Sequence, residues 1–155
     1  MIGDRTEVGA PVVGNVDLFP QATLLIQKAE LDWAFAPGKP PPFQRDRPIR
    51  ALEDDLDVFG DGSVVILSTP GHTPGHESLL VHLQRLGWVV LSGDLAHFRD
   101  NWNNRRVPSM NTSPEQTQAS LARIAQVLAD KHAQLWINHD KAESLAQRHS
   151  PAFYD

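Results

Sequence analysis

Residues with the chemistry of metal ligands follow three short apolar segments of the sequence. The first segment is followed by His72 and His76, the second by Asp94 and the third by His139. Imidazole nitrogens and carboxylate oxygens bind zinc and similar divalent ions, and they are the only strong ligands available because the chain contains no cysteine. Sites of α/β proteins lie where the ends of several strands meet at one edge of a sheet, so this pattern predicts a metal site.

The two histidines of the first group belong to a loop. A spacing of four residues would place His72 and His76 on one face of a helix, but Pro74 and Gly75 lie between them and disfavour helix. We therefore expect the two imidazoles to point in independent directions. Three further histidines are interpreted as structural or solvated: His82, His132 and His149.

Other catalytic schemes find little support in the sequence. The G-x-S-x-G, G-x-x-x-x-G-K-[ST] and G-x-G-x-x-G motifs do not occur, which disfavours a serine hydrolase, a P-loop nucleotide hydrolase and a dinucleotide-binding enzyme. The acidic segment 53–57 has the chemistry to hold a hard cation or to pair carboxylates for acid–base catalysis, but we interpret it as a solvated loop before a strand.

The surrounding pattern predicts a meander of strands followed by a long helix. Ser113 and Pro114 form the start of that helix, with the Ser113 hydroxyl accepting from the N–H of Gln116. Short helices are expected at 28–35 and 141–147, and loops at 1–22 and at the proline-rich stretch 37–48. The expected strands are 23–26, 63–67, 78–83, 88–91 and 135–137, with a hairpin turn at 60–62. The apolar face of the long helix comprises Thr117, Leu121, Ile124, Ala125 and Leu128.

Composition narrows the class of protein. Of 155 residues, 41% are hydrophobic and 21% charged, as expected for one globular domain over 1–155. The net charge of −5 leaves no basic field for a nucleic acid, so no nucleic-acid partner is expected. The apolar runs are too short to span a bilayer, so we expect no membrane partner and a cytoplasmic location.

Three segments carry a resemblance to a known family. The sequence reads Ser-Thr-Pro-Gly-His-Thr-Pro-Gly-His over 68–76, Ser-Gly-Asp over 92–94 and Asn-His-Asp over 138–140. This combination resembles the second half of the metallo-β-lactamase superfamily. The stretches 93–99, 105–109 and 151–154 are similar to N-acyl homoserine lactonase-like members. The resemblance covers about 14–155 and implies an α/β fold that is part of the family's αββα sandwich.

The resemblance also implies roles for individual residues. By motif, His76 binds one metal ion, Asp94 bridges two ions and His139 binds the second, while His72 orients a neighbouring ligand. His97 takes the position of a tyrosine in similar lactonases and would hydrogen-bond the developing oxyanion, so Asp94 and His97 are the candidate catalytic residues. The implied cofactor is one or two zinc or other divalent ions. The implied reaction is metal-assisted hydrolysis of a small lactone or related ester.

The start of the chain departs from the family pattern. The H-x-H-x-D-H motif expected just before Gly14 does not occur, and residues 1–13 have no counterpart in the family. We therefore expect a C-terminal portion of a larger hydrolase, with the N-terminal half of the fold largely missing. A sheet left open in this way favours a homo-oligomer or pairing with a complementing N-terminal segment.

Two other functions stay open from the sequence alone. One is a non-catalytic, truncated module of the same fold with an interaction or assembly role. The other is hydrolysis of thioesters, as in proteins of the glyoxalase II type.

Overall fold

The structure is a computed structural model that describes residues 12–13, 16–17, 19, 21–38 and 48–155. The chain divides into two compact units, Met1–Glu53 and Asp54–Asp155, which are described separately below. The expectation of one domain over the whole chain stays a prediction.

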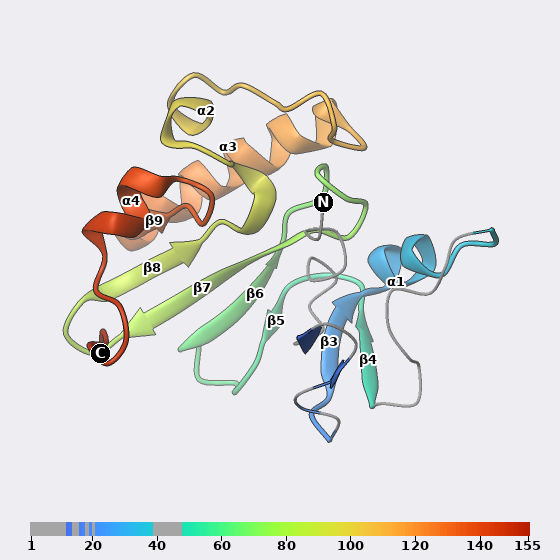
Figure 1. Cartoon of the computed structure of the whole chain (residues 1–155), viewed down its shortest axis with the longest axis horizontal. Helices are drawn as coiled ribbons and strands as arrows, with labels where there is room; N and C mark the ends of the chain where they lie inside the picture. The colour runs from blue at the N-terminus through green and yellow to red at the C-terminus, as the bar shows by residue number, and fades with distance from the viewer. Residues whose placement is uncertain (1–11, 14–15, 18, 20, 39–47) are drawn as a thin grey trace. The chain divides into compact units, whose positions relative to one another are not determined.

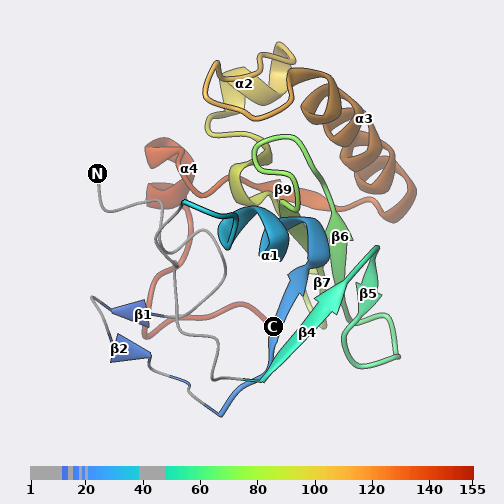
Figure 2. The same ribbon diagram turned by 90° about the vertical axis from the view of Figure 1, so that its right-hand side faces the viewer.

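The first unit contains a parallel strand pair joined by a helix (Figure 2). Strand β3 (Leu24–Gln27) pairs with β4 (Ile49–Leu52), and helix α1 (Lys28–Ala34) follows β3 directly. A small core holds these elements together, because Leu24, Ile26 and Ala34 are buried. The strand expected at 23–26 and the short helix expected at 28–35 are confirmed to within a residue.

The predicted loop over 1–22 is wrong at four residues. Strand β1 (Val12–Val13) pairs antiparallel with β2 (Val16–Asp17), as the β-branched valines favour. The proline-rich stretch predicted as a loop lies largely outside the described residues, which resume at Pro48.

The second unit is built on a five-stranded sheet in the order β5-β6-β7-β8-β9 (Figure 1). Neighbouring strands are antiparallel from β5 to β8, while β8 and β9 are parallel. The strands are β5 (Leu56–Asp57), β6 (Val64–Ser68), β7 (Glu77–Leu83), β8 (Gly87–Leu91) and β9 (Gln134–Trp136). The strands predicted in this region are confirmed to within a residue or two.

This topology brings three strand ends together. Strands β6 and β8 are both antiparallel to β7, so they run in the same direction, and β9 runs parallel to β8. The carboxyl ends of β6, β8 and β9 therefore share one edge of the sheet. The three groups of ligand-type residues follow these three ends, as the sequence predicted.

Helices connect β8 to β9 and complete the unit. A 3₁₀ turn (Gly93–Leu95) and helix α2 (Arg99–Asn103) precede helix α3 (Pro114–Lys131), and helix α4 (Lys141–Ala146) follows β9. The Ser113 hydroxyl accepts from Gln116 N at 3.2 Å, which confirms the predicted cap. In the described part of the chain, no helix combines the length and apolar character needed to cross a membrane.

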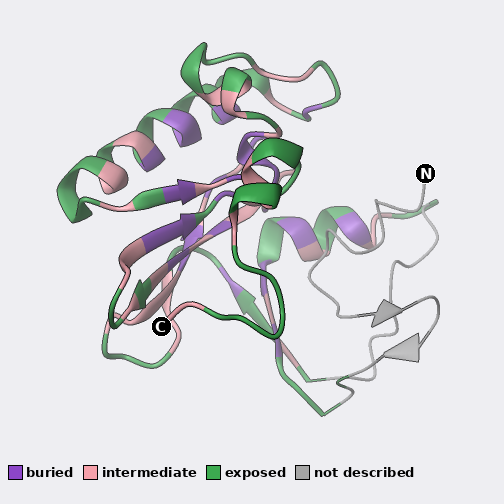
Figure 3. Cartoon of the chain, turned by 60° about the vertical axis from the view of Figure 1, so that its left-hand side comes forward, coloured by how far each residue is buried: buried purple, intermediate pink, exposed green. Residues whose placement is uncertain are grey.

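Helix α3 packs one face on the sheet. Its buried residues recur at helical spacing, and the helix alternates buried and exposed stretches (Figure 3). Leu121 and Ile124 from α3 share a core cluster with Leu67, Val90 and Leu135 from three strands. This packing holds the long connection between the two parallel strands against the sheet.

We expect the Ile124→Ala variant to lose about 2–5 kcal/mol of unfolding free energy, because Ile124 is fully buried and truncation leaves a cavity. The exposed Gln126 on the same helix supplies the control, and Gln126→Ala should change stability by less than about 0.5 kcal/mol. Urea denaturation followed by circular dichroism measures both values. Equal losses in the two variants would contradict the packing of α3 described above.

Candidate metal centre

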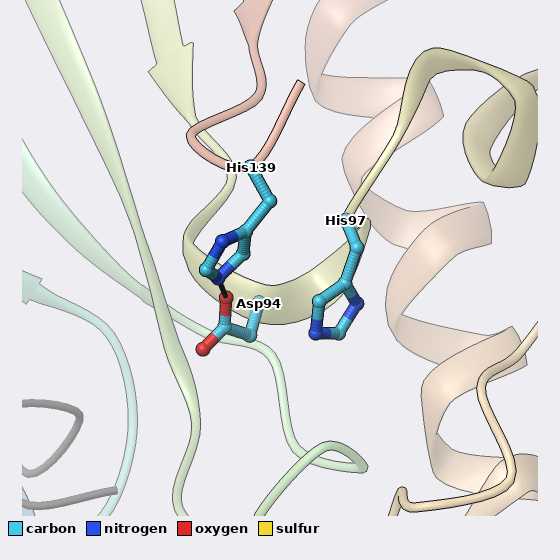
Figure 4. A group of neighbouring side chains, drawn as sticks. All are labelled: Asp94, His97 and His139. Atoms are coloured by element: carbon cyan, nitrogen blue, oxygen red, sulfur yellow. Dashed lines mark ion pairs between the residues drawn. The ribbon is translucent and has the colours of Figure 1, made fainter. Parts of the chain in front are cut away.

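Asp94 lies at the centre of the group formed at the shared strand ends. It belongs to the 3₁₀ turn after β8 and is buried, with 6% of its surface exposed. Its Oδ1 is 2.8 Å from Nε2 of His139, and its Oδ2 is 3.7 Å from Nε2 of His72. Figure 4 shows the His139 ring directed at this carboxylate, with His97 alongside. One carboxylate thus faces an imidazole on each oxygen.

His97 is the third ring beside the carboxylate. Its ring stacks on that of His139 with 5.1 Å between centroids and 15° between planes, and it contacts His72 edge-on. Burial lowers the pKa of His97, and the neighbouring His72 and His139 act in the same direction while Asp94 opposes them. His97 is therefore biased towards the neutral imidazole, which is the form that binds metal.

Asp94, His97 and His139 each offer a ligand atom, and these atoms lie within 4.8 Å of one another. Within the described residues, the buried Nδ1 of His97 has no hydrogen-bond partner. A buried polar nitrogen without a partner is costly unless a ligand engages the ring. Two imidazoles and a carboxylate are also a donor set suited to zinc, so the residues fit a divalent ion.

His76 is held in a different way from the other histidines. Its Nδ1 donates to the carbonyl oxygen of Thr69 at 3.0 Å, and its Nε2 accepts from the backbone N–H of Asp94 at 2.8 Å. Burial lowers the pKa of His76 to about 4, with the nearby His72 contributing. The ring is therefore neutral and both nitrogens are engaged by the protein. In this arrangement His76 fixes the backbone of Asp94, and the ligand role expected for it has no nitrogen left to use.

His72 faces the side chain of Asp94, whereas His76 contacts its backbone. Its Nδ1 contacts Oδ1 of Asn111 at 3.2 Å, while its Nε2 faces the Asp94 carboxylate. The sequence predicted that the two loop histidines would point independently, and they do, with ring centroids 5.9 Å apart and planes at 79°.

A further set of contacts positions the loops that carry His97 and His139. Arg99 donates from its backbone N to Asp140 Oδ2 at 2.9 Å, from Nη2 to Leu135 O at 2.8 Å and from Nε to Glu143. Glu143 Oε2 accepts from Ile137 N at 3.2 Å. Arg99 and Glu143 were not among the residues predicted from the sequence. The available signal was Asp140, an aspartate directly before the helix predicted at 141–147, where it favours capping. Asp140 Oδ1 does cap α4 by accepting from Ala142 N at 3.0 Å.

The residues interpreted as structural lie away from this group. His82 packs on Trp88, His132 ends helix α3 with a left-handed backbone, and His149 contacts Ser144 O at 2.7 Å. In the acidic segment, Asp55 accepts from Ser68 N at 2.9 Å. Asp57 accepts from Gly60 N and Gly62 N at 2.9 and 2.7 Å, as expected for turn-forming carboxylates.

Comparison with known proteins finds relatives that are named as N-acyl homoserine lactonases or hydrolases. No family model matches the chain. The N-acyl homoserine lactonase AttM of Azorhizobium caulinodans is 32% identical over 154 residues, which cover 92% of this chain and 59% of AttM. A solved N-acyl homoserine lactone hydrolase with N-hexanoyl-L-homoserine at its catalytic metal centre superposes with a TM-score of 0.79 and 25% identity. That match covers 88% of this chain and 54% of the solved one.

A third relative shares the fold at lower identity. AidC, a dizinc quorum-quenching lactonase solved with a bound product, superposes with a TM-score of 0.60 and 20% identity, over 86% of this chain and 53% of AidC. The chain thus spans between half and three fifths of the length of these relatives.

The fold of the chain agrees with the fold of these solved relatives. The chain belongs to the metallo-β-lactamase superfamily of hydrolases. Within the superfamily it is a relative of the N-acyl homoserine lactonases, and it matches slightly more than half of their length.

We expect Gly93→Ala to lower the unfolding free energy by about 1–3 kcal/mol more than Gly87→Ala, since only the first change overpacks its surroundings. A Cβ at Gly93 would lie 2.8 Å from His76 Nε2 and 3.0 Å from Glu77 O, and the His76 ring is pinned at both nitrogens.

Gly87 is a matched control because its φ is also positive, at +85° against +54°, yet a Cβ there meets nothing within 4 Å. Backbone strain is therefore common to both variants. Urea denaturation measures the difference, and equal destabilisation would show that the contact between Gly93 and His76 does not constrain the site.

Proposed function

We propose that this chain contributes the metal-binding site of a hydrolase acting on lactones or related esters. The observation that carries the proposal is the buried Asp94 carboxylate, which faces His139 on one oxygen and His72 on the other. Support also comes from AttM, a relative named as an N-acyl homoserine lactonase. The substrate class is thus a small acyl lactone.

The proposed metal is zinc, held by Asp94 and His139 with His72 on the second carboxylate oxygen. This assignment exchanges the roles that the resemblance implied for the two loop histidines, because His76 already uses both nitrogens within the protein. Zinc bound at this place supplies a Lewis acid that polarises a carbonyl and lowers the pKa of water.

The residues around the carboxylate have separate tasks. His76 holds the backbone N–H of Asp94 and so fixes where its carboxylate points. His97 reaches the same place and has two proposed roles, as a third ligand or as a hydrogen-bond donor to the oxyanion that develops on the substrate. The His97→Ala variant separates them: a ligand role requires loss of zinc, whereas a donor role requires loss of turnover at unchanged zinc content.

The wider expectations on partners and location stay predictions. Self-association is tested by light scattering of the full chain, where a monomer at high concentration would contradict it. Pairing with a complementing N-terminal segment is the alternative that a monomer would leave in place. A cytoplasmic location is tested by cell fractionation.

We expect Asp94→Asn and His139→Ala each to reduce bound zinc at least tenfold, because the first change replaces the charged carboxylate by a neutral amide and the second removes an imidazole ligand. His149→Ala is the control, since His149 is exposed in the segment after α4, where it contacts Ser144 O. Elemental analysis after dialysis against a fixed zinc concentration measures the content. Unchanged zinc in both site variants would overturn the assignment.

We expect the zinc-loaded chain to open N-hexanoyl homoserine lactone, with Asp94→Asn lowering the rate by at least about 100-fold because the metal is lost. Chromatography of the ring-opened product measures turnover, and a hexanoyl thioester serves as the competing substrate. Faster thioester cleavage would favour the glyoxalase II type of activity. Zinc binding with no turnover of either substrate would favour a non-catalytic module.

A further inference from the structure

We propose that Asn111 and Thr117 are positioning residues that set the protonation tautomer of His72 and so direct its Nε2 towards the metal. This inference rests on the proposed function for the identity of the metal, but its structural part concerns the metal-free chain. Neither residue belongs to the motifs that carry the family resemblance.

Three hydrogen bonds lead from helix α3 to His72, and each has a fixed direction. We call this series, which runs through Thr117 and Asn111, the relay. The Ser113 carbonyl can only accept, so the Thr117 hydroxyl donates to it at 2.9 Å. The Thr117 oxygen then accepts from Asn111 Nδ2 at 3.0 Å, which orients the amide. Asn111 Oδ1 therefore faces the His72 ring at 3.2 Å, and as an acceptor it requires the proton on Nδ1.

The consequence is that Nε2 of the neutral His72 ring carries no proton. A neutral imidazole carries one proton, and with that proton on Nδ1 the other nitrogen presents a lone pair. Nε2 is the atom that lies 3.7 Å from Asp94 Oδ2. The relay therefore selects the tautomer that can bind a cation at this carboxylate.

Burial makes the direction of the relay costly to reverse. Asn111 is 7% exposed and Thr117 is fully buried, so water cannot replace a lost partner. Reversing one bond would leave a buried donor facing a donor, which costs more than an exposed hydrogen bond gains.

Backbone contacts anchor the relay to the histidine loop. Ser113 N donates to Gly71 O at 2.9 Å, and Thr112 N donates to His72 O at 3.1 Å. At Gly71 the packing is so close that a Cβ would lie 2.4 Å from Thr117 N. The distance between the His72 ring and Asn111 is thus fixed by main chain on both sides.

The test compares Thr117→Val with Thr117→Ser in the full chain. Valine keeps the shape but removes the oxygen that orients the Asn111 amide, whereas serine keeps that oxygen. We expect zinc affinity, measured by competition with a chromophoric chelator near neutral pH, to fall about tenfold or more in Thr117→Val and to stay at the wild-type value in Thr117→Ser. Equal affinities in the two variants would overturn the proposal.

Asn111 supplies a second, independent pair. Asn111→Leu removes the acceptor for His72 Nδ1, while Asn111→Asp keeps it. The Thr117 hydroxyl can turn to the new carboxylate in Asn111→Asp, because the Ser113 carbonyl still accepts from Thr117 N at 3.0 Å. We expect Asn111→Asp to bind zinc at least as well as the wild-type chain and Asn111→Leu to bind it at least tenfold more weakly. The opposite order would contradict the relay.

A readout on the metal-free chain separates this inference from the proposed function. Nitrogen NMR of the His72 imidazole should show the Nδ1–H tautomer in the wild-type chain and in Thr117→Ser, with the Nε2–H tautomer appearing in Thr117→Val and Asn111→Leu. If the wild-type chain binds no zinc, the proposed metal site fails while this tautomer result still decides the relay. An Nδ1–H tautomer retained in Asn111→Leu would overturn the inference itself.

Discussion

The parallel pairing of β8 with β9 is the constraint on which the site depends. Leu91 lies opposite Trp136, and Ser92 N continues the ladder by donating to Trp136 O at 3.0 Å. Both strands therefore end at the same level of the sheet, so Asp94 and His139 meet three residues beyond the ends of β8 and β9. A parallel pair needs a long crossover, and helix α3 supplies it. The core beneath α3 is thus part of the mechanism by which two distant residues become neighbours.

Burial gives this meeting point its electrostatic character. Four imidazole rings lie around Asp94: three lie beside its carboxylate and the fourth, His76, contacts its backbone N–H. Positive charges on several of these rings would repel one another. His76 avoids a charge because both nitrogens are engaged and burial holds its pKa near 4. Behind it, Thr69 and Ser78 share a hydrogen bond of 3.0 Å, and the Ser78 hydroxyl donates to Ser92 O at 3.0 Å. The groups around His76 are therefore neutral and hydrogen-bonded, and they orient Asp94 through their dipoles. Burying such dipoles costs less free energy than burying charges.

Much of the fold, and the place where the candidate site residues gather, could be predicted from the sequence, whereas the contacts that distinguish these residues from one another could not. Short apolar runs separated by turns placed the strands of the second unit, and Ser113 with Pro114 placed α3. The position of Asp94 and His139 after predicted strands grouped them, and the family resemblance gave them roles. The TPGHTPGH segment, however, contains two histidines in equivalent local sequence. Only the tertiary contacts distinguish the ring that receives the Asp94 N–H from the ring that faces the Asp94 side chain. The contacts of Arg99 with Glu143 and Leu135 also join elements far apart in the chain, for which local pattern carries no signal.

Asp140 shows how one residue can serve the loops on both sides of the site. Its Oδ1 caps helix α4, which orders the segment that begins directly after His139, and its Oδ2 accepts from the backbone of Arg99, two residues after His97. These backbone contacts lower the pKa of the Asp140 carboxyl, with the bond from Arg99 contributing most. A single carboxylate therefore ties the backbone beside His139 to the backbone beside His97. This contact keeps the two loops in place, which allows the His97 and His139 rings to stack. The stacking in turn stabilises the loops, because it is lost when either loop shifts. The Asp140 side chain thus holds the backbone of both loops that flank Asp94, independently of any bound ion.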